Sequence, residues 1–129
     1  MKQDLLRIAD LQVTVDDKVV LSQVDFGLKT GEVAVLLGEN GSGKSSLAMA
    51  LVGDFRYKIL GESKVVFDGK NLLDMSSDER ARAGLFTVWQ NPVSVPGVSV
   101  FTLCRTSYEA MGNKIATLTE FKQTLETLA

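Results

Sequence analysis

Residues 38–45 have the sequence Gly-Glu-Asn-Gly-Ser-Gly-Lys-Ser, which fills every fixed position of the pattern G-x-x-x-x-G-K-[ST]. The apolar run 32–37 before it predicts a β-strand, and residues 46–51 after it predict the opening turns of a helix. A strand, a glycine-rich loop and a helix in this order are the context in which this motif holds phosphate. We therefore predict an α/β fold built around a phosphate-binding loop.

The residue types in this loop explain how it would hold a nucleotide. Glycines without a β-carbon let successive N–H groups turn inward around a phosphate, and the following helix adds its positive dipole end. Lys44 would reach the β- and γ-phosphates, and the Ser45 hydroxyl would ligate Mg²⁺. A glycine-rich turn that merely links a strand to a helix is disfavoured, because all the fixed positions are filled. The predicted nucleotide-binding residues of the loop are Gly38, Glu39, Asn40, Gly41, Ser42, Gly43, Lys44, Ser45 and Ser46.

The composition is that of a soluble globular protein. The chain has 129 residues, 45% hydrophobic and 23% charged, with a net charge of −2, which argues against a surface that coats nucleic acid. No apolar run is long enough to span a bilayer, so no direct membrane insertion is expected. The single cysteine, Cys104, cannot form an intramolecular disulfide, which favours a cytoplasmic location. With no histidine in the chain to act as its base, Cys104 is predicted to pack in the core.

Hydrophobic periodicity and turn residues predict the remaining elements. Asp16 and Asp17 predict the turn of a β-hairpin, and Ser76 with Glu79 predicts a capping box that opens a short helix ending near Gly84. From about Phe101 the chain is predicted to be helical, with an amphipathic helix or pair of helices over residues 115–128. The predicted strands are residues 5–8, 11–15, 18–21, 24–28, 32–37, 63–67 and 85–89.

An ordered set of short motifs resembles the ATP-binding cassette (ABC) ATPases. The set comprises Leu21-x-x-Val24-x-Phe26, Gly31-Glu32-Val33, the loop at 38–45, Phe67-Asp-Gly69, Leu72-Leu73, Glu79-Arg80, Gly84 and Gln90. Within that superfamily, the stretch 89–99, Trp-Gln-Asn-Pro-Val-Ser-Val-Pro-Gly-Val-Ser, is similar to the SufC-like ATPases of the SUF iron–sulfur cluster assembly system. The resemblance covers the whole chain.

This resemblance implies a fold, cofactors and partners. It implies a P-loop NTPase core with an antiparallel β-subdomain (residues 1–30 and 63–68), all within residues 1–90, and the start of a helical subdomain over 91–129. ATP and Mg²⁺ are the implied cofactors. The implied partners are SUF scaffold subunits (SufB/SufD-like) and a second ATPase head, with no nucleic acid.

The resemblance also assigns roles to single residues. Gln90 matches the glutamine that touches Mg²⁺ and the attacking water, so Ser45 and Gln90 are the implied metal-binding residues. Val15 falls where many members stack an aromatic ring on adenine, so base recognition is expected to be weak. Trp89 is expected to pack in the core rather than to stack on a base.

Three family motifs are not found in the sequence: the signature helix, the Asp-Glu strand end and the switch histidine. We therefore expect the chain to correspond to the N-terminal half of an ABC ATPase, incomplete at its C-terminus. No complete catalytic set is expected in it, although Lys44 and Gln90 would contribute in a longer protein. An ABC transporter subunit and a nucleotide-binding module that does not hydrolyse ATP remain alternatives.

Overall fold

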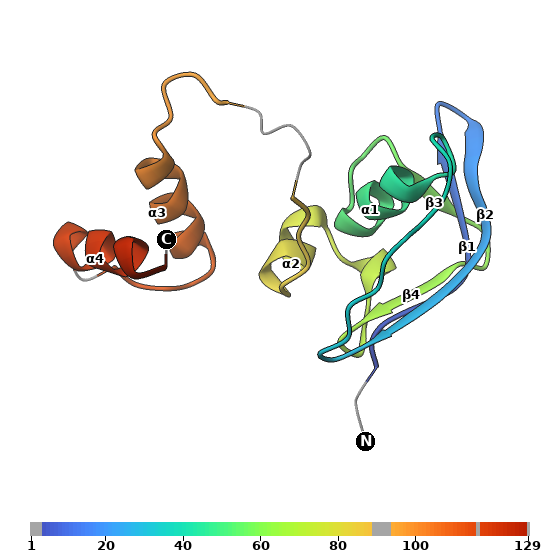
Figure 1. Ribbon diagram of the computed structural model, residues 1–129, viewed down its shortest axis with the longest axis horizontal. Coiled ribbons are helices and arrows are strands. Elements are labelled where there is room, and N and C mark those ends of the chain that lie inside the picture. The colour runs from blue at the N-terminus through green and yellow to red at the C-terminus, as the bar shows by residue number, and fades with distance from the viewer. Residues whose placement is uncertain (1–3, 89–93, 116, 129) are drawn as a thin grey trace. The chain divides into compact units, whose positions relative to one another are not determined.

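The computed structural model describes residues 4–88, 94–115 and 117–128. Contacts between residues divide the chain into two compact units, residues 1–88 and 89–129. Each unit has its own secondary structure, and the two are described separately below (Figure 1). The first unit carries the sheet and the predicted phosphate loop, and the second carries a pair of helices.

The strands in the described part of the first unit form one antiparallel sheet. Its strands are β1 (Asp4–Val15), β2 (Lys18–Lys29), β3 (Lys58–Leu60), β4 (Lys64–Phe67) and β5 (Lys70–Asn71). The strand order is β2-β1-β4-β5, and β3 pairs with the other end of β1 (Figure 1). The sheet therefore extends the predicted β-subdomain by residues 58–60, which were not predicted to form a strand, and by β5.

The predicted hairpin is confirmed, with longer strands than expected. Asp16 and Asp17 have φ values of 49° and 60°, the left-handed conformation that tight hairpin turns need. Residues 5–8 and 11–15 belong to one strand rather than two. Asp10 (φ 51°) forms a bulge between them without ending the strand. The extra residue reverses the side-chain alternation, so that Leu6, Ile8, Leu11 and Val13 are all buried.

Two predicted strands are not formed. Residues 32–37 and 85–88 have no regular secondary structure, and Trp89 lies outside the described residues. Both segments are apolar, but a strand also needs a neighbour that takes up its backbone hydrogen bonds. No strand of the described residues pairs with either segment. The prediction of these two strands was wrong because it rested on their hydrophobic pattern and did not consider which strand would pair with them.

One helix covers the sheet. Helix α1 (Lys44–Val52) contains the predicted helix at 46–51 but begins two residues earlier, at Lys44, and buries Leu47 and Ala50. It lies beside the sheet (Figure 1). It ends at Gly53, whose φ of 83° suits a left-handed helix cap. A 3-10 turn, η1 (Leu72–Asp74), follows β5. The buried core consists of Leu6, Ile8, Leu11, Val13, Leu21, Leu47, Ala50, Val65, Phe67 and Leu72.

The predicted capping box is confirmed at helix α2 (Ser77–Arg82). The Ser76 N–H donates a hydrogen bond of 2.8 Å to Glu79 Oε2, which satisfies a backbone donor that the helix itself leaves free. The helix is followed by Gly84, with φ of 97°. The short helix therefore ends where the glycine predicted.

The second unit is a pair of helices, α3 (Val100–Ala110) and α4 (Leu118–Leu128). The predicted amphipathic segment is confirmed as α4, in which Phe121 is only 4% exposed. The Phe121 ring lies 5.6 Å from Phe101 and 5.4 Å from Tyr108, measured between centroids. Cys104 on α3 is half-buried. No helix within the described ranges is long and apolar enough to cross a membrane.

Candidate functional site

The candidate site is the loop from Gly38 to Gly43 together with the first turn of α1. Gly41 and Gly43 have φ values of 87° and 92°, so the chain turns twice through the left-handed region before the helix starts. The Ser42 N–H donates to the Glu39 carbonyl at 3.2 Å, which closes the turn. Gly43 is the N-cap of α1, and its carbonyl accepts the Leu47 N–H at 2.9 Å. The loop therefore leads directly into the positive end of the helix.

The Lys44 side chain folds back over this loop. Its Nζ donates to the carbonyl oxygens of Gly38 and Glu39, both at 2.7 Å, and to Ser42 Oγ at 3.2 Å. These acceptors are uncharged, and the first turn of α1 contains no acidic residue. The positive charge of the ammonium group is consequently not neutralised by any of these contacts. It stays available to a negatively charged ligand, where charge-assisted hydrogen bonds are strongest.

A side chain at either of two glycines would be crowded. A β-carbon at Gly38 would lie 2.6 Å from Ser42 Oγ. A β-carbon at Gly43 would lie 2.5 Å from Leu21 Cδ2 and 3.2 Å from the Val20 carbonyl oxygen, so the loop rests against β2. This close fit, with an uncompensated ammonium group beside a helix N-terminus, suits a phosphate group.

The remaining predicted residues divide into three groups. Glu39, Asn40 and Ser45 are exposed, and Ser46 is half-buried behind Ser45 in the first turn of α1. Gln90 lies outside the described residues, so its predicted role as a metal ligand stays a prediction. A Mg²⁺ ion bound to the Ser45 hydroxyl would offset the negative charge of the phosphates.

Val15, expected beside the base, is half-buried at the end of β1, where it pairs with Lys18. It lies two residues along the strand from Val13, whose partner Leu21 contacts Gly43. The hairpin end is thus on the same side of the unit as the loop. The aliphatic side chain of Val15 offers apolar contact to a base but no aromatic face for stacking.

Arg80 was not predicted as part of the site, yet it fixes the far end of α1. It is 8% exposed, and its Nη1 donates to the carbonyl oxygens of Ala50 at 3.0 Å and Leu51 at 2.9 Å. Its Nε donates to the Met75 carbonyl at 3.1 Å, and burial lowers the pKa of the guanidinium group. The cation sits where the negative end of a helix dipole favours it. The sequence showed Arg80 only as one element of a family pattern, with no signal for this contact.

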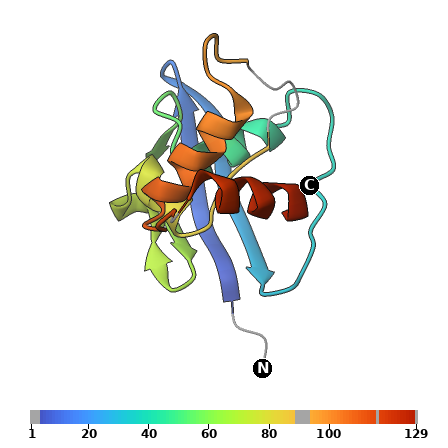
Figure 2. The ribbon, with the colours of Figure 1, turned by 90° about the vertical axis from the view of Figure 1, so that its left-hand side faces the viewer.

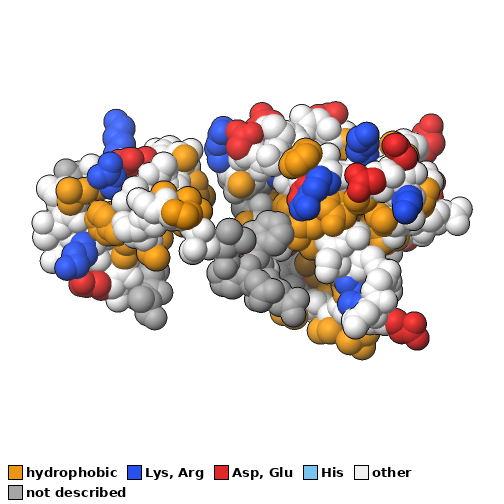
Figure 3. Space-filling view, turned by 90° about the horizontal axis from the view of Figure 1, so that it is seen from above, with side chains coloured by type: hydrophobic (Ala, Val, Ile, Leu, Met, Phe, Trp, Pro, Cys, Tyr) orange, Lys and Arg blue, Asp and Glu red, His pale blue; other side chains and the backbone are white. Residues whose placement is uncertain are grey.

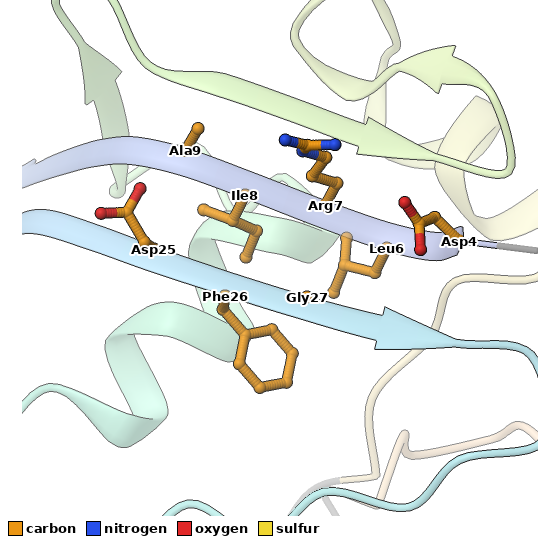
Figure 4. Close-up of a pocket in the computed structure, with 8 residues that line it drawn as sticks. All are labelled: Asp4, Leu6, Arg7, Ile8, Ala9, Asp25, Phe26 and Gly27. Atoms are coloured by element: carbon orange, nitrogen blue, oxygen red, sulfur yellow. The ribbon is translucent and has the colours of Figure 1, made fainter.

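A hollow in the first unit lies away from this loop. It has a volume of about 450 Å³ and runs along β1 and β2. Arg7 and Ala9 project to one side of β1 and Ile8 to the other (Figure 4). No residue of the loop lines this hollow, so it is separate from the candidate site. The lining residues are Asp4, Leu6, Arg7, Ile8, Ala9, Asp25, Phe26 and Gly27.

Residues 21–129 match the protein family described as ABC transporter. The chain belongs to this family. The match begins in β2 and includes the whole loop, the rest of the first unit and all of the second unit, but not β1. Membership therefore places the loop, Lys44 and α1 in a family of ATP-binding proteins, in agreement with the resemblance drawn from the motifs.

Individual ABC family relatives carry two kinds of name. The chain is 41% identical over 82% of its length to the probable ABC transporter ATP-binding protein SpyM3_0208 of Streptococcus pyogenes, and covers 41% of that protein. It is 41% identical over 83% of its length to the probable ATP-dependent transporter SufC of Escherichia coli, and covers 43% of it. Identity to the probable ATP-dependent transporter ycf16 of Pyropia yezoensis is 36%, over 94% of the chain and 47% of that protein. The chain thus spans less than half the length of these relatives.

Proposed function

We propose that the chain binds a nucleoside di- or triphosphate with Mg²⁺ through residues 38–46. The observation that carries the proposal is the position of the Lys44 ammonium group, held over the loop by two carbonyl oxygens at 2.7 Å. A bound phosphate would offer this group a charged acceptor in place of neutral ones. Lys44 and the loop N–H groups would hold the β-phosphate, and Ser45 would hold the metal.

Recognition is expected to come from the phosphates rather than from the base. Val15 supplies no stacking surface, so adenine gains only apolar contact. ADP and GDP should bind within about 1 kcal/mol of each other, a few-fold in Kd. AMP lacks the β-phosphate that the loop holds and should bind at least about tenfold more weakly.

Calorimetry with Mg²⁺ and each of ADP, GDP and AMP tests the proposal. Lys44→Ala should weaken ADP binding and remove the difference between ADP and AMP. Lys70→Ala is the matched control, because Lys70 is an exposed lysine of β5 in the same unit. Equal affinity of the unchanged chain for AMP and ADP, or full ADP binding by Lys44→Ala, would contradict phosphate recognition by the loop.

For the longer protein to which this chain would correspond, we propose ATP-driven iron–sulfur cluster assembly with SUF scaffold subunits. Support comes from the 41% identity to the protein named SufC and from the sequence at residues 89–99. The alternative is an ABC transporter subunit, which the equal identity to the streptococcal protein favours.

The two alternatives differ in the partner. A tagged chain should retain a SufB/SufD-like scaffold pair in a pull-down, and Pro96→Ala together with Pro92→Ala should weaken that retention without changing ADP affinity. Retention of an ABC transporter membrane subunit instead of the scaffold pair would favour the transporter. Lack of any effect of the proline changes would place the contact elsewhere.

The absence of an Asp-Glu strand end from the sequence favours nucleotide binding without hydrolysis by this chain. Phosphate release by the purified chain is expected to stay at background. Steady release that Lys44→Ala abolishes would show instead that the chain hydrolyses ATP.

A further inference from the structure

Among the glycines of the phosphate loop, Gly43 is the one that lies against another element. A β-carbon at Gly41 would have nothing within 4 Å, and the atoms nearest to one at Gly38 belong to the site itself. A β-carbon at Gly43 would lie 2.5 Å from Leu21 Cδ2, closer than real β-carbons approach other atoms. A methyl group of Leu21 therefore fills the space beside Gly43.

The hydrogen bonds described for the loop do not reach the sheet. They run from the Ser42 N–H to the Glu39 carbonyl oxygen and from Lys44 Nζ to two carbonyl oxygens of the loop. The chain before the loop, residues 33–37, pairs with no strand of the described residues and is drawn as coil between β2 and α1 (Figure 2). The position of the loop on the sheet therefore depends on α1 and on the contact with Leu21.

Leu21 is itself firmly held. Several hydrophobic side chains are exposed at the surface (Figure 3), but Leu21 is only 9% exposed. It lies opposite the completely buried Val13 in the ladder between β1 and β2, and it belongs to the same core as Leu47 of α1. Because protein interiors are close-packed, a side chain in this place transmits the position of the sheet to the loop.

We propose that Leu21 is a positioning residue for the phosphate loop. Its side chain holds Gly43, and with it the first turn of α1, so that the loop N–H groups are aligned before the β-phosphate arrives. A loop that is ordered in advance loses less conformational entropy on binding, which raises the affinity. Leu21 acts through Gly43 and does not touch the ligand. The inference rests on the proposed binding of nucleotide phosphates by residues 38–46.

Calorimetry of leucine variants with ADP and AMP tests this role. Leu21→Ala should weaken ADP binding about three- to tenfold and AMP binding less than about twofold, because the β-phosphate is the group that needs the aligned loop. Leu6→Ala is the matched control, since Leu6 is 7% exposed in the same core and pairs near the opposite end of β2. It should leave the ratio of the AMP and ADP dissociation constants unchanged. Loss of folded protein alone lowers both apparent affinities equally and does not move this ratio.

Three further variants examine the contact itself. Leu21→Val removes Cδ2 but leaves a smaller cavity, so it should lower the ratio by about two- to threefold with less risk to folding. Leu21→Met keeps the side-chain volume and should retain the ratio of the unchanged chain. The factor by which Gly43→Ala weakens ADP binding should be at least about threefold smaller in a Leu21→Ala background, because the overlap with Cδ2 is then gone.

Amide hydrogen exchange in the ligand-free chain gives a readout that does not depend on nucleotide. The Leu47 N–H donates to the Gly43 carbonyl oxygen at 2.9 Å, so its exchange rate reports on the first turn of α1. At urea concentrations that give both variants the same free energy of unfolding, this amide should exchange at least about threefold faster in Leu21→Ala than in Leu6→Ala.

The outcomes separate this role from the proposed function. If the unchanged chain prefers ADP to AMP, then an unchanged ratio in Leu21→Ala, or an exchange rate of the Leu47 amide equal to that in Leu6→Ala, would each overturn the role of Leu21 alone. Equal affinity of the unchanged chain for ADP and AMP would instead overturn the proposed function, and the positioning role with it.

Discussion

A β-carbon at Gly43 would be unfavourable for two reasons, the backbone conformation and the lack of space. Its φ of 92° is a conformation that L side chains rarely adopt, and a β-carbon there would lie 2.5 Å from Leu21 Cδ2. Gly41 has a similar φ of 87°, but open space surrounds it. A substitution at Gly41 therefore tests backbone strain alone, whereas one at Gly43 tests strain and steric overlap together.

Gly43→Ala should lower the free energy of unfolding by about 2–4 kcal/mol, because left-handed strain and overpacking both act. Gly41→Ala should cost only about 1–2 kcal/mol, from strain alone. Urea denaturation followed by circular dichroism measures both values. Equal losses would show that Leu21 moves aside at no cost.

At the scale of single residues, the sequence predicted the loop but not its internal contacts. A motif specifies residue types, so Lys44 and the glycines could be named from it. The carbonyl oxygens that hold the Lys44 ammonium group come from the backbone path, which no side-chain pattern records. Arg80 was missed for the same reason, since its acceptors are carbonyl oxygens of α1.

Helix α1 is held at its C-terminal end by the α2 side chain Arg80. Arg80→Met should lower the free energy of unfolding by about 1–3 kcal/mol, because the carbonyl oxygens of Ala50, Leu51 and Met75 each lose a hydrogen bond from the guanidinium group. Arg82→Met is the matched control on the same helix. Its partner is the exposed Asp78, and a surface ion pair contributes about 0–1 kcal/mol.

Urea denaturation again measures the two changes, and calorimetry with ADP adds a second readout. If Arg80 positions α1 and with it the loop, Arg80→Met should weaken ADP binding under conditions where the variant is fully folded. Losses of equal size in Arg80→Met and Arg82→Met would rule out a specific role of the buried cation.

The capping box predicts a pH dependence of α2. The Ser76 backbone N–H, and then its hydroxyl group, hold the pKa of Glu79 below its ordinary value of 4.5. A carboxylate with a depressed folded-state pKa stabilises the fold above the unfolded pKa, and this stabilisation is lost as pH falls through the folded value. NMR titration should therefore find Glu79 ionised below pH 4.5, and α2 should fray at more acidic pH. A midpoint at 4.5 or above would contradict the capping contact.

Among the elements, those with local signals were predictable and those that depend on distant partners were not. The Asp16–Asp17 turn, the Ser76 cap and Gly84 act on their own neighbourhood. Segments 32–37 and 85–88 have the composition of buried strands, but a strand forms in a sheet only when a neighbouring strand pairs with its backbone hydrogen-bonding groups. The short strand β3 shows the converse, because its pairing with β1 outweighs a polar sequence context.

The whole molecule consists of two units with separate cores. The second unit depends on one buried ring, Phe121, which contacts Phe101 and Tyr108. Phe121→Ala should remove most of the helicity of α3 and α4, since loss of a buried Phe costs about 3–5 kcal/mol. ADP binding by the first unit should be unchanged. Circular dichroism and calorimetry measure the two effects.

Phe55→Ala is the control for this change, because Phe55 is exposed in the first unit and should leave helicity intact. A parallel loss of ADP binding in Phe121→Ala would show that the two units fold as one cooperative body.

The open backbone of residues 33–37 also has a consequence for the lifetime of the chain. Proteases bind their substrates as extended strands, which is the state this segment offers when nothing pairs with it. Cleavage there requires no unfolding of the sheet, so its rate should not follow the global stability of the chain. Elastase, which cuts after small apolar residues, should therefore nick the chain within residues 33–37 at urea concentrations that leave the sheet folded.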